Sequence, residues 1–261
     1  MPPDMFVATL TVPGTGTPVR LAYRDSAHDG AGLPVMVLLH GSPGTSDVFL
    51  KLTPLLPPGL RVIAPDLPGF GRSTRQVPDY SFRAHARYVL ALLEELNIAS
   101  AQIVGFSMGG GVALSMEDLA PERVRSIVML SAIGVQEHEL AGSYGWNHAL
   151  HGAKLGALWL AREGLPHFGA LDRWDLDMSY ARNFFDSDQR PLRRILESYR
   201  GPLLIVHGTR DRNVPVAAAL EHHRLAPQSE LVLLDESHFI TFRHPEAFAG
   251  TLGKFLQRHA R

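Results

Sequence analysis

Short runs of Val, Ile and Leu alternate with longer amphipathic stretches along most of the chain. In a parallel β-sheet helices cover both faces, so each strand reads as a nearly continuous apolar run. The pattern predicts an α/β fold, with a mostly parallel, eight-stranded twisted sheet flanked by helices. The expected strands are residues 5–12, 19–24, 35–40, 61–66, 102–106, 126–131, 203–207 and 231–235.

The first two strands are expected to form an antiparallel hairpin at one edge, because the turn residues Pro13, Gly14 and Gly16 lie between them. Amphipathic periodicity predicts the helices. The helix beginning at Phe82 has the clearest pattern, and Ser81 is placed to cap it. The expected helices are residues 47–55, 82–96, 108–119, 216–225 and 245–259.

Strand-like runs are absent between residues 134 and 200, where short helical segments are expected. This stretch is far longer than a usual connection between two strands. We therefore predict an α/β core of residues 1–133 and 201–261 with a helical cap inserted at 134–200. Its apolar side chains are expected to cover an apolar cleft or to pack the cap onto the core, and its histidines to lie at the surface. These side chains include Trp146, Trp159 and Trp174, and the histidines are His138, His148, His151 and His167.

Composition excludes several classes of protein. The 25 basic and 26 acidic residues nearly cancel, so the chain lacks the positive field that gathers nucleic acid. It has no cysteine, and its 13 histidines lack the spacing of a zinc site, so no metal or other cofactor is expected. No apolar run is long enough to span a membrane. We expect a cytoplasmic monomer or homodimer that acts on a small molecule, without stable membrane insertion.

The segment Gly105-Phe106-Ser107-Met108-Gly109 connects an apolar strand directly to a helix. It has the G-x-S-x-G pattern of a nucleophile elbow, in which the serine occupies a sharp, strained turn. Glycines on both sides let the helix approach the strand closely. The turn presents the hydroxyl at a helix N-terminus, where the dipole favours developing negative charge. Ser107 is therefore the predicted nucleophile.

With this motif in place, the chain from Val35 to the C-terminus resembles the α/β-hydrolase fold superfamily. In that superfamily the nucleophile comes first, the acid second and the histidine last. The resemblance implies that Asp211, in a G-x-x-D-x-x-x-P run after a strand, is the acid. It implies that His238, in the loop after the last strand, is the base. Loops at the carboxyl ends of strands hold the active sites of open α/β sheets.

The loop that begins His40-Gly41-Ser42 resembles the superfamily loop that supplies one oxyanion donor. Acyl transfer needs donors preorganised where the tetrahedral oxygen becomes charged. We assign the backbone N–H groups of Ser42 and Met108 to this role. His40 itself is expected to be a structural hydrogen-bonding residue beneath the loop.

Other titratable residues compete with the triad. Asp66 is expected to belong to a packed turn. Asp235 is too close in sequence to His238 to be its partner. His244 precedes Pro245 at a helix start, so we expect it to cap that helix or to face solvent.

These parts predict a serine hydrolase that cleaves a small, apolar carboxylic ester through an acyl-enzyme. An alternative is a carbon–carbon bond hydrolase acting on a dienoic ketone, which the run G-x-S-M-G-G at residues 105–110 resembles. Phe106 and Phe239 stand where those enzymes commonly have asparagine and tryptophan. Dehalogenases and epoxide hydrolases need a carboxylate where Ser107 stands. A noncatalytic ligand-binding homologue is the other alternative, since fold alone does not establish activity.

Overall fold

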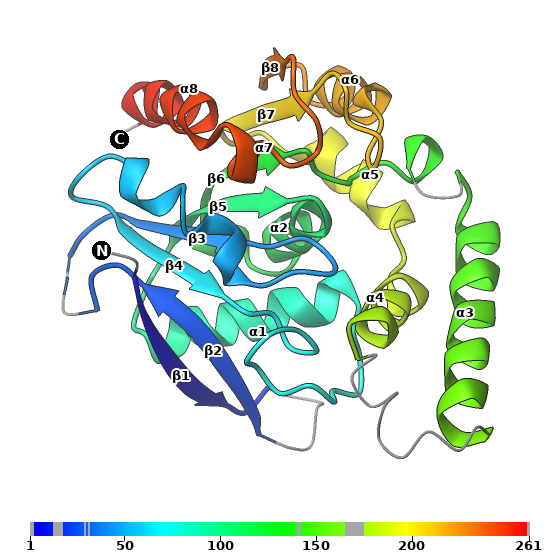
Figure 1. Ribbon diagram of the computed structural model, residues 1–261. Helices are drawn as coiled ribbons and strands as arrows, with labels where there is room; N and C mark the ends of the chain where they lie inside the picture. Colours follow the sequence, from blue (N-terminus) through cyan, green and yellow to red (C-terminus); the bar gives the residue numbers. More distant parts are fainter. Residues whose placement is uncertain are drawn as a thin grey trace.

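The computed structural model describes residues 3–12, 18–28, 30, 32–139, 142–164 and 175–259. Eight strands form one sheet in the order β1-β2-β4-β3-β5-β6-β7-β8 (Figure 1). Strands β1 and β2 run antiparallel to their neighbours, and the six strands β3 to β8 are mutually parallel. The predicted fold class is confirmed, and every predicted strand is present with its ends shifted by no more than two residues. The strands are β1 Asp4–Leu10, β2 Val19–Asp25, β3 Val35–Leu39, β4 Arg61–Pro65, β5 Ala101–Phe106, β6 Val124–Leu130, β7 Leu203–Gly208 and β8 Glu230–Leu234.

The antiparallel hairpin is confirmed at the sheet edge. Strands β1 and β2 pair in register from Asp4 opposite Asp25 to Leu10 opposite Val19. The turn residues that suggested it, Pro13, Gly14 and Gly16, lie outside the described residues.

The central strands are largely apolar because each faces two cores. In β3, Val37 and Leu39 belong to the cluster packed under α1 and α2, whereas Met36 and Leu38 belong to the cluster packed under α8. Successive side chains of a strand point to opposite faces, so a sheet covered on both sides needs apolar residues at every position.

Four of the five predicted helices are present. Ser81 caps α1 by accepting a hydrogen bond from Ala84 N at 3.1 Å. The predicted helix 47–55 is wrong: the segment forms two short 3₁₀ turns, Ser46–Phe49 (η1) and Thr53–Leu55 (η2). Pro54 has no N–H to continue an α-helical ladder through this point. The α-helices are α1 Phe82–Glu95, α2 Met108–Leu119, α3 Tyr144–Gly164, α4 Asp175–Asp186, α5 Arg190–Ser198, α6 Val216–Leu225, α7 Ile240–Arg243 and α8 Pro245–Arg258.

None of the described helices has the length and apolar character to cross a membrane.

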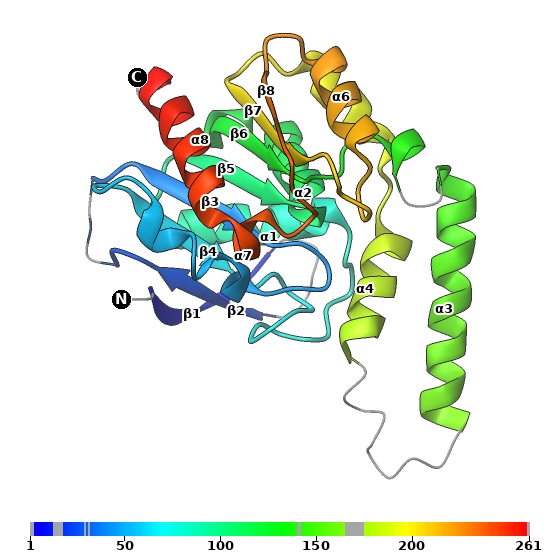
Figure 2. The ribbon, with the colours of Figure 1, turned by 45° about the horizontal axis from the view of Figure 1, so that its top comes forward.

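Three helices, α3, α4 and α5, connect β6 to β7. Helix α3 is 21 residues long rather than a short segment, and it stands beside α4 away from the sheet in Figure 1 and Figure 2. Trp146 and Trp159 on α3 are 65% and 58% exposed, so these two rings do not pack onto the core. Trp174 lies outside the described residues.

The histidines between β6 and β7 do not share one environment. His138 is exposed, as expected. His148 is half-buried and stacks on Phe185, with ring centroids 4.0 Å apart. His151 is buried against Phe184 and Tyr180, so its predicted surface position is wrong. It lies on the face of α3 that packs on α4, a partner that periodicity alone does not specify. His167 lies outside the described residues.

Candidate active site

Ser107 lies on a strained turn between β5 and α2. Its φ of 52° and ψ of −119° place it in a region that residues with a side chain rarely adopt. A Cβ on Gly105 would lie 2.4 Å from the Gly109 carbonyl oxygen, and a Cβ on Gly109 would lie 2.3 Å from the Leu39 carbonyl oxygen. Both glycines are therefore required sterically, because their neighbours at these distances are backbone atoms.

Gly109→Ala is expected to destabilise the chain by about 1–3 kcal/mol, since the added methyl group must displace β3 or α2. Urea denaturation would measure the change. Gly250→Ala is the matched control, because Gly250 lies on the exposed face of α8 and a Cβ there would have no neighbour within 4 Å. That control is expected to be more stable than wild type by about 0.5–1 kcal/mol. A Gly109→Ala variant as stable as the control would disprove the close approach.

Asp211 and His238 form a buried hydrogen-bonded pair. Asp211 Oδ2 lies 2.7 Å from His238 Nδ1, and Asp211 Oδ1 accepts from the backbone N–H groups of Asn213 at 2.8 Å and Val214 at 2.9 Å. Burial alone would raise the pKa of Asp211. The hydrogen bond and charge of His238, with the two N–H groups, outweigh burial and hold this pKa below its ordinary value. The carboxylate is therefore ionised at neutral pH and orients the imidazole.

A second imidazole, His207, faces the same carboxylate, and sequence reasoning did not select it. His207 Nε2 lies 2.9 Å from the Val214 carbonyl oxygen and 3.5 Å from Asp211 Oδ2. A carbonyl oxygen only accepts, so Nε2 carries the proton. Burial lowers the pKa of His207, which is therefore neutral. It closes the turn that carries Asp211. The sequence could have indicated this role, because His207 stands at the end of β7, four residues before Asp211.

The residues that compete with Asp211 and His238 for the roles of acid and base lie outside this pair. The Asp235 side chain is 85% exposed and pairs with Arg210, whose Nε is 2.9 Å from Asp235 Oδ1. His244 is exposed at the start of α8, with Nε2 3.3 Å from Glu236 Oε1. In the structure His238 pairs with Asp211, and the catalytic roles of both residues stay predictions.

His40 and Asp66 support the loops around the site. His40 is fully buried, donates through Nδ1 to the carbonyl of the next residue at 2.7 Å, and accepts from Leu67 N at 2.9 Å. Burial lowers its pKa, so it is a neutral structural residue. The buried Asp66 carboxylate accepts hydrogen bonds from Ser46 and Arg72. Both ring nitrogens of His40 and both carboxylate oxygens of Asp66 therefore have hydrogen-bond partners within these loops.

Loops from several strand ends converge around Ser107. A Cβ on Gly41, in the loop after β3, would lie 2.9 Å from Ser107 Cβ. The ring of Phe106 lies 5.0 Å from the His238 ring, centroid to centroid. These loops follow parallel strands, so they meet at the carboxyl edge of the sheet, as in other open α/β sheets.

The two predicted oxyanion donors lie next to residues of this junction in the chain. Ser42 follows Gly41 directly, and Met108 is the first residue of α2, where helix N–H groups have no partner within the helix. Within the described part of the chain, the N–H groups of Ser42 and Met108 donate to no protein acceptor. They are available to a ligand oxygen. Across those same residues, no cluster of three or more His, Asp or Glu side chains is placed to hold a metal.

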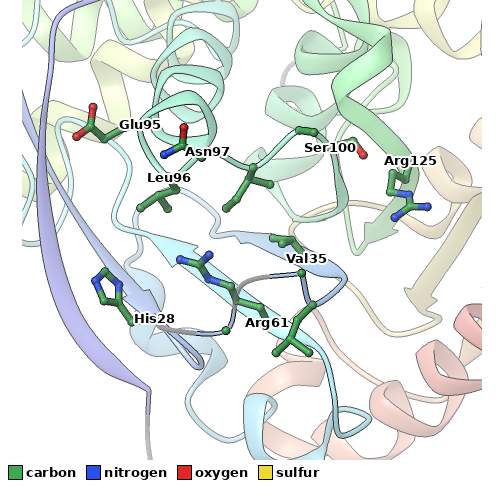
Figure 3. Close-up of a pocket in the computed structure, with 13 residues that line it drawn as sticks. His28, Val35, Arg61, Glu95, Leu96, Asn97, Ser100 and Arg125 are labelled. Carbon is green, nitrogen blue, oxygen red and sulfur yellow. The ribbon is translucent and has the colours of Figure 1, made fainter.

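A separate cavity of about 600 Å³ lies at the opposite edge of the sheet (Figure 3). Its walls include Val35, Arg61 and Arg125, which stand at the amino ends of β3, β4 and β6. The Arg61 guanidinium is already paired with Asp25, 2.7 Å between Nη2 and Oδ2. This cavity is therefore distinct from the junction around Ser107.

A parallel sheet with a serine turn after a central strand, and an Asp–His pair after two later strands, defines the α/β-hydrolase class. The family described as "alpha/beta hydrolase fold" matches residues 34–163. The chain belongs to the α/β-hydrolase fold superfamily, a family of hydrolases, which confirms the resemblance seen in the sequence.

Individual relatives carry different activities. The chain is 29% identical over 266 residues to a 2-hydroxymuconate semialdehyde hydrolase from Pseudomonas putida, covering 90% of this chain and 91% of that protein. It is 30% identical over 248 residues to the dihydrolipoyllysine-residue acetyltransferase component of an acetoin cleaving system from Pseudomonas putida, covering 88% of this chain but 65% of that protein. A thermophilic esterase from Thermogutta terrifontis superimposes with a TM-score of 0.77 at 20% identity, covering 97% of this chain and 99% of that one. The last likeness shows the fold alone.

Proposed function

We propose that this chain is a serine hydrolase that cleaves a small, partly apolar carboxylic ester through an acyl-enzyme. The observation that carries the proposal is the 2.7 Å hydrogen bond between Asp211 and His238, beside a strained turn that presents Ser107. An ionised carboxylate on Nδ1 leaves Nε2 as the basic nitrogen.

The proposed reaction assigns a group to each step. His238 Nε2 removes the Ser107 proton as the hydroxyl oxygen attacks the ester carbonyl, and Asp211 stabilises the imidazolium that forms. The N–H groups of Ser42 and Met108 stabilise the oxyanion. His238 then protonates the departing alcohol. Water activated by the same imidazole releases the acid and regenerates the serine.

We also propose that α3, α4 and α5 act as a cap, with residues 134–200 as a unit separate from the core. Helix α4 is joined to the loop that follows β4 at the carboxyl edge. Ser179 Oγ donates to the Gly69 carbonyl oxygen at 2.6 Å, and Asn183 Nδ2 donates to the Tyr80 carbonyl oxygen at 2.7 Å. Both contacts support a position for α4 over the edge where the reaction is proposed.

Aromatic rings around His238 support an apolar alcohol part. The Phe239 ring lies 5.3 Å from the imidazole in an edge-on arrangement, and the Phe242 ring lies 6.0 Å from that of Phe239. These rings are 44% and 40% exposed, which is unusual for phenylalanine. Because His238 protonates the leaving oxygen, an alcohol group held beside it comes close to these rings.

Phe239→Ala is expected to raise KM for benzyl acetate by roughly threefold to tenfold, because part of an aromatic contact is lost. KM for methyl acetate should change little, since its alcohol part is too small to reach the ring. Val7→Ala, which shortens an equally exposed apolar residue on β1, is the control. The same KM increase for both esters would contradict an alcohol subsite at Phe239.

Carbon–carbon bond cleavage is the second candidate, because the 2-hydroxymuconate semialdehyde hydrolase matches along nearly its whole length. The deciding experiment is a panel of p-nitrophenyl esters of graded acyl length, assayed beside one dienoic ketone. We expect kcat/KM to be highest for a short or medium acyl ester. Faster cleavage of the ketone than of every ester would replace ester hydrolysis with the second candidate.

A further inference from the structure

Glu139 is a buried carboxylate with no role in the proposed chemistry. Its side chain lies in the segment between β6 and α3 and the residue is 2% exposed. Glu139 Oε1 accepts from the backbone N–H groups of Gly134 at 2.7 Å and Val135 at 2.9 Å. Removing a carboxylate from water is costly unless hydrogen bonds and charges compensate. The two N–H groups are one part of that compensation.

The segment that Glu139 holds packs directly on the elbow. Ile133 N donates to the Ser107 carbonyl oxygen at 3.1 Å. A Cβ on Gly110 would lie 2.5 Å from Ala132 Cβ, so α2 touches this segment at its first turn. The backbone of Ser107 is therefore braced by residues immediately before the pair that Glu139 fixes.

His222 on α6 lies against Glu139 from the other side. His222 is fully buried, and its Nε2 lies 3.5 Å from Glu139 Oε1. A Cβ on Gly134 would lie 2.7 Å from the same nitrogen, so the turn and the imidazole are in close contact.

We infer that Glu139 is a positioning residue for the nucleophile, holding the 132–135 segment against the backbone of Ser107 with His222 as its counterpart on α6. The inference rests on the proposed function, because it assigns the role through Ser107. A displaced elbow changes the approach of the hydroxyl to the carbonyl, and a misplacement of about 1 Å costs on the order of a hundredfold in rate. Substrate affinity is not altered by that displacement, so the effect falls on kcat and not on KM.

The test compares Glu139→Gln, Glu139→Asp and Glu139→Ala. The measurements are the rate constant of Ser107 labelling by a fluorophosphonate, kcat and KM for p-nitrophenyl acetate, and Tm. Glutamine keeps an oxygen at the position of Oε1, so its labelling rate should stay within about threefold of wild type. Alanine removes the oxygen and aspartate withdraws it, and each should label roughly 30- to 100-fold more slowly with KM within about twofold.

Glu137→Ala is the control, because Glu137 lies in the same segment but its exposed side chain bonds Arg193, whereas the N–H groups of Gly134 and Val135 donate to Glu139. It should label at the wild-type rate. A folded Glu139→Ala variant that labels as fast as wild type would overturn the inference. If that variant does not fold, fast labelling of Glu139→Asp with slow labelling of Glu139→Gln would overturn it instead. Failure of the wild-type chain to label at Ser107 would refute the proposed function itself, which separates the two failures.

Discussion

Ser107→Ala is expected to lower kcat for a short-chain chromogenic ester by on the order of 10⁴- to 10⁶-fold, while the chain stays folded. Without the hydroxyl no acyl-enzyme forms, and only the oxyanion donors and substrate binding accelerate attack by water. The side chain lies at a turn whose strain belongs to the backbone, so its truncation leaves the packing of β5 and α2 intact. Steady-state kinetics with matched circular dichroism spectra would measure the loss.

Ser115→Ala is the matched control for this experiment. Ser115 lies on the same helix, two turns beyond the elbow, and its hydroxyl donates to the Gly111 carbonyl oxygen at 2.8 Å. It should keep kcat within about twofold, since it touches no reacting group. Fluorophosphonate labelling and peptide mapping should place the modification on Ser107. Equal activity in wild type and Ser107→Ala would remove this residue from the mechanism.

Asp211→Asn is expected to lower kcat by on the order of 10⁴-fold. The amide oxygen can still accept from Asn213 N and Val214 N, so the turn is preserved. The amide nitrogen then faces His238 Nδ1 and donates to it, which moves the imidazole proton to Nε2 and blocks its function as a base. Kinetics at pH 8, with Tm measured for both proteins, would separate this loss from unfolding.

Asp235→Asn controls for a general loss of negative charge near the histidine loop. Asp235 is three residues from His238 in sequence, yet its side chain is 85% exposed and bonded to Arg210. We expect kcat within about twofold of wild type. Loss of activity in Asp235→Asn, with activity kept in Asp211→Asn, would transfer the acid role to Asp235.

Local features of the sequence predicted the parts that depend on near neighbours. Strand positions follow from apolar runs, because a strand in the middle of a covered sheet is apolar on both faces, as β3 is. The elbow at Ser107 follows from two flanking glycines. A Cβ on Gly105 is excluded by backbone atoms of the helix that follows the turn, so that requirement is local. A Cβ on Gly109 is excluded instead by Leu39 of the neighbouring strand β3.

Prediction from the sequence was poorer where local preferences compete and where a neighbouring helix covers a side chain. Residues 47–55 have the apolar spacing of a helix, but Pro54 removes an N–H from that helix and the segment forms 3₁₀ turns instead. His151 resembles a surface histidine in sequence and is buried because α4 covers it.

The sequence by itself determined the mostly parallel sheet and the strained serine turn, and its resemblance to the α/β-hydrolase superfamily predicted Asp211 and His238 as acid and base. Only the tertiary structure decided that His207 closes the turn of Asp211 and that Glu139 and His222 meet behind the elbow. The physical reason is the range of the interactions. Periodicity and turn chemistry act between residues a few positions apart, whereas burial and the pairing of Glu139 with His222 depend on segments 83 positions apart in the chain that only the folded sheet brings together.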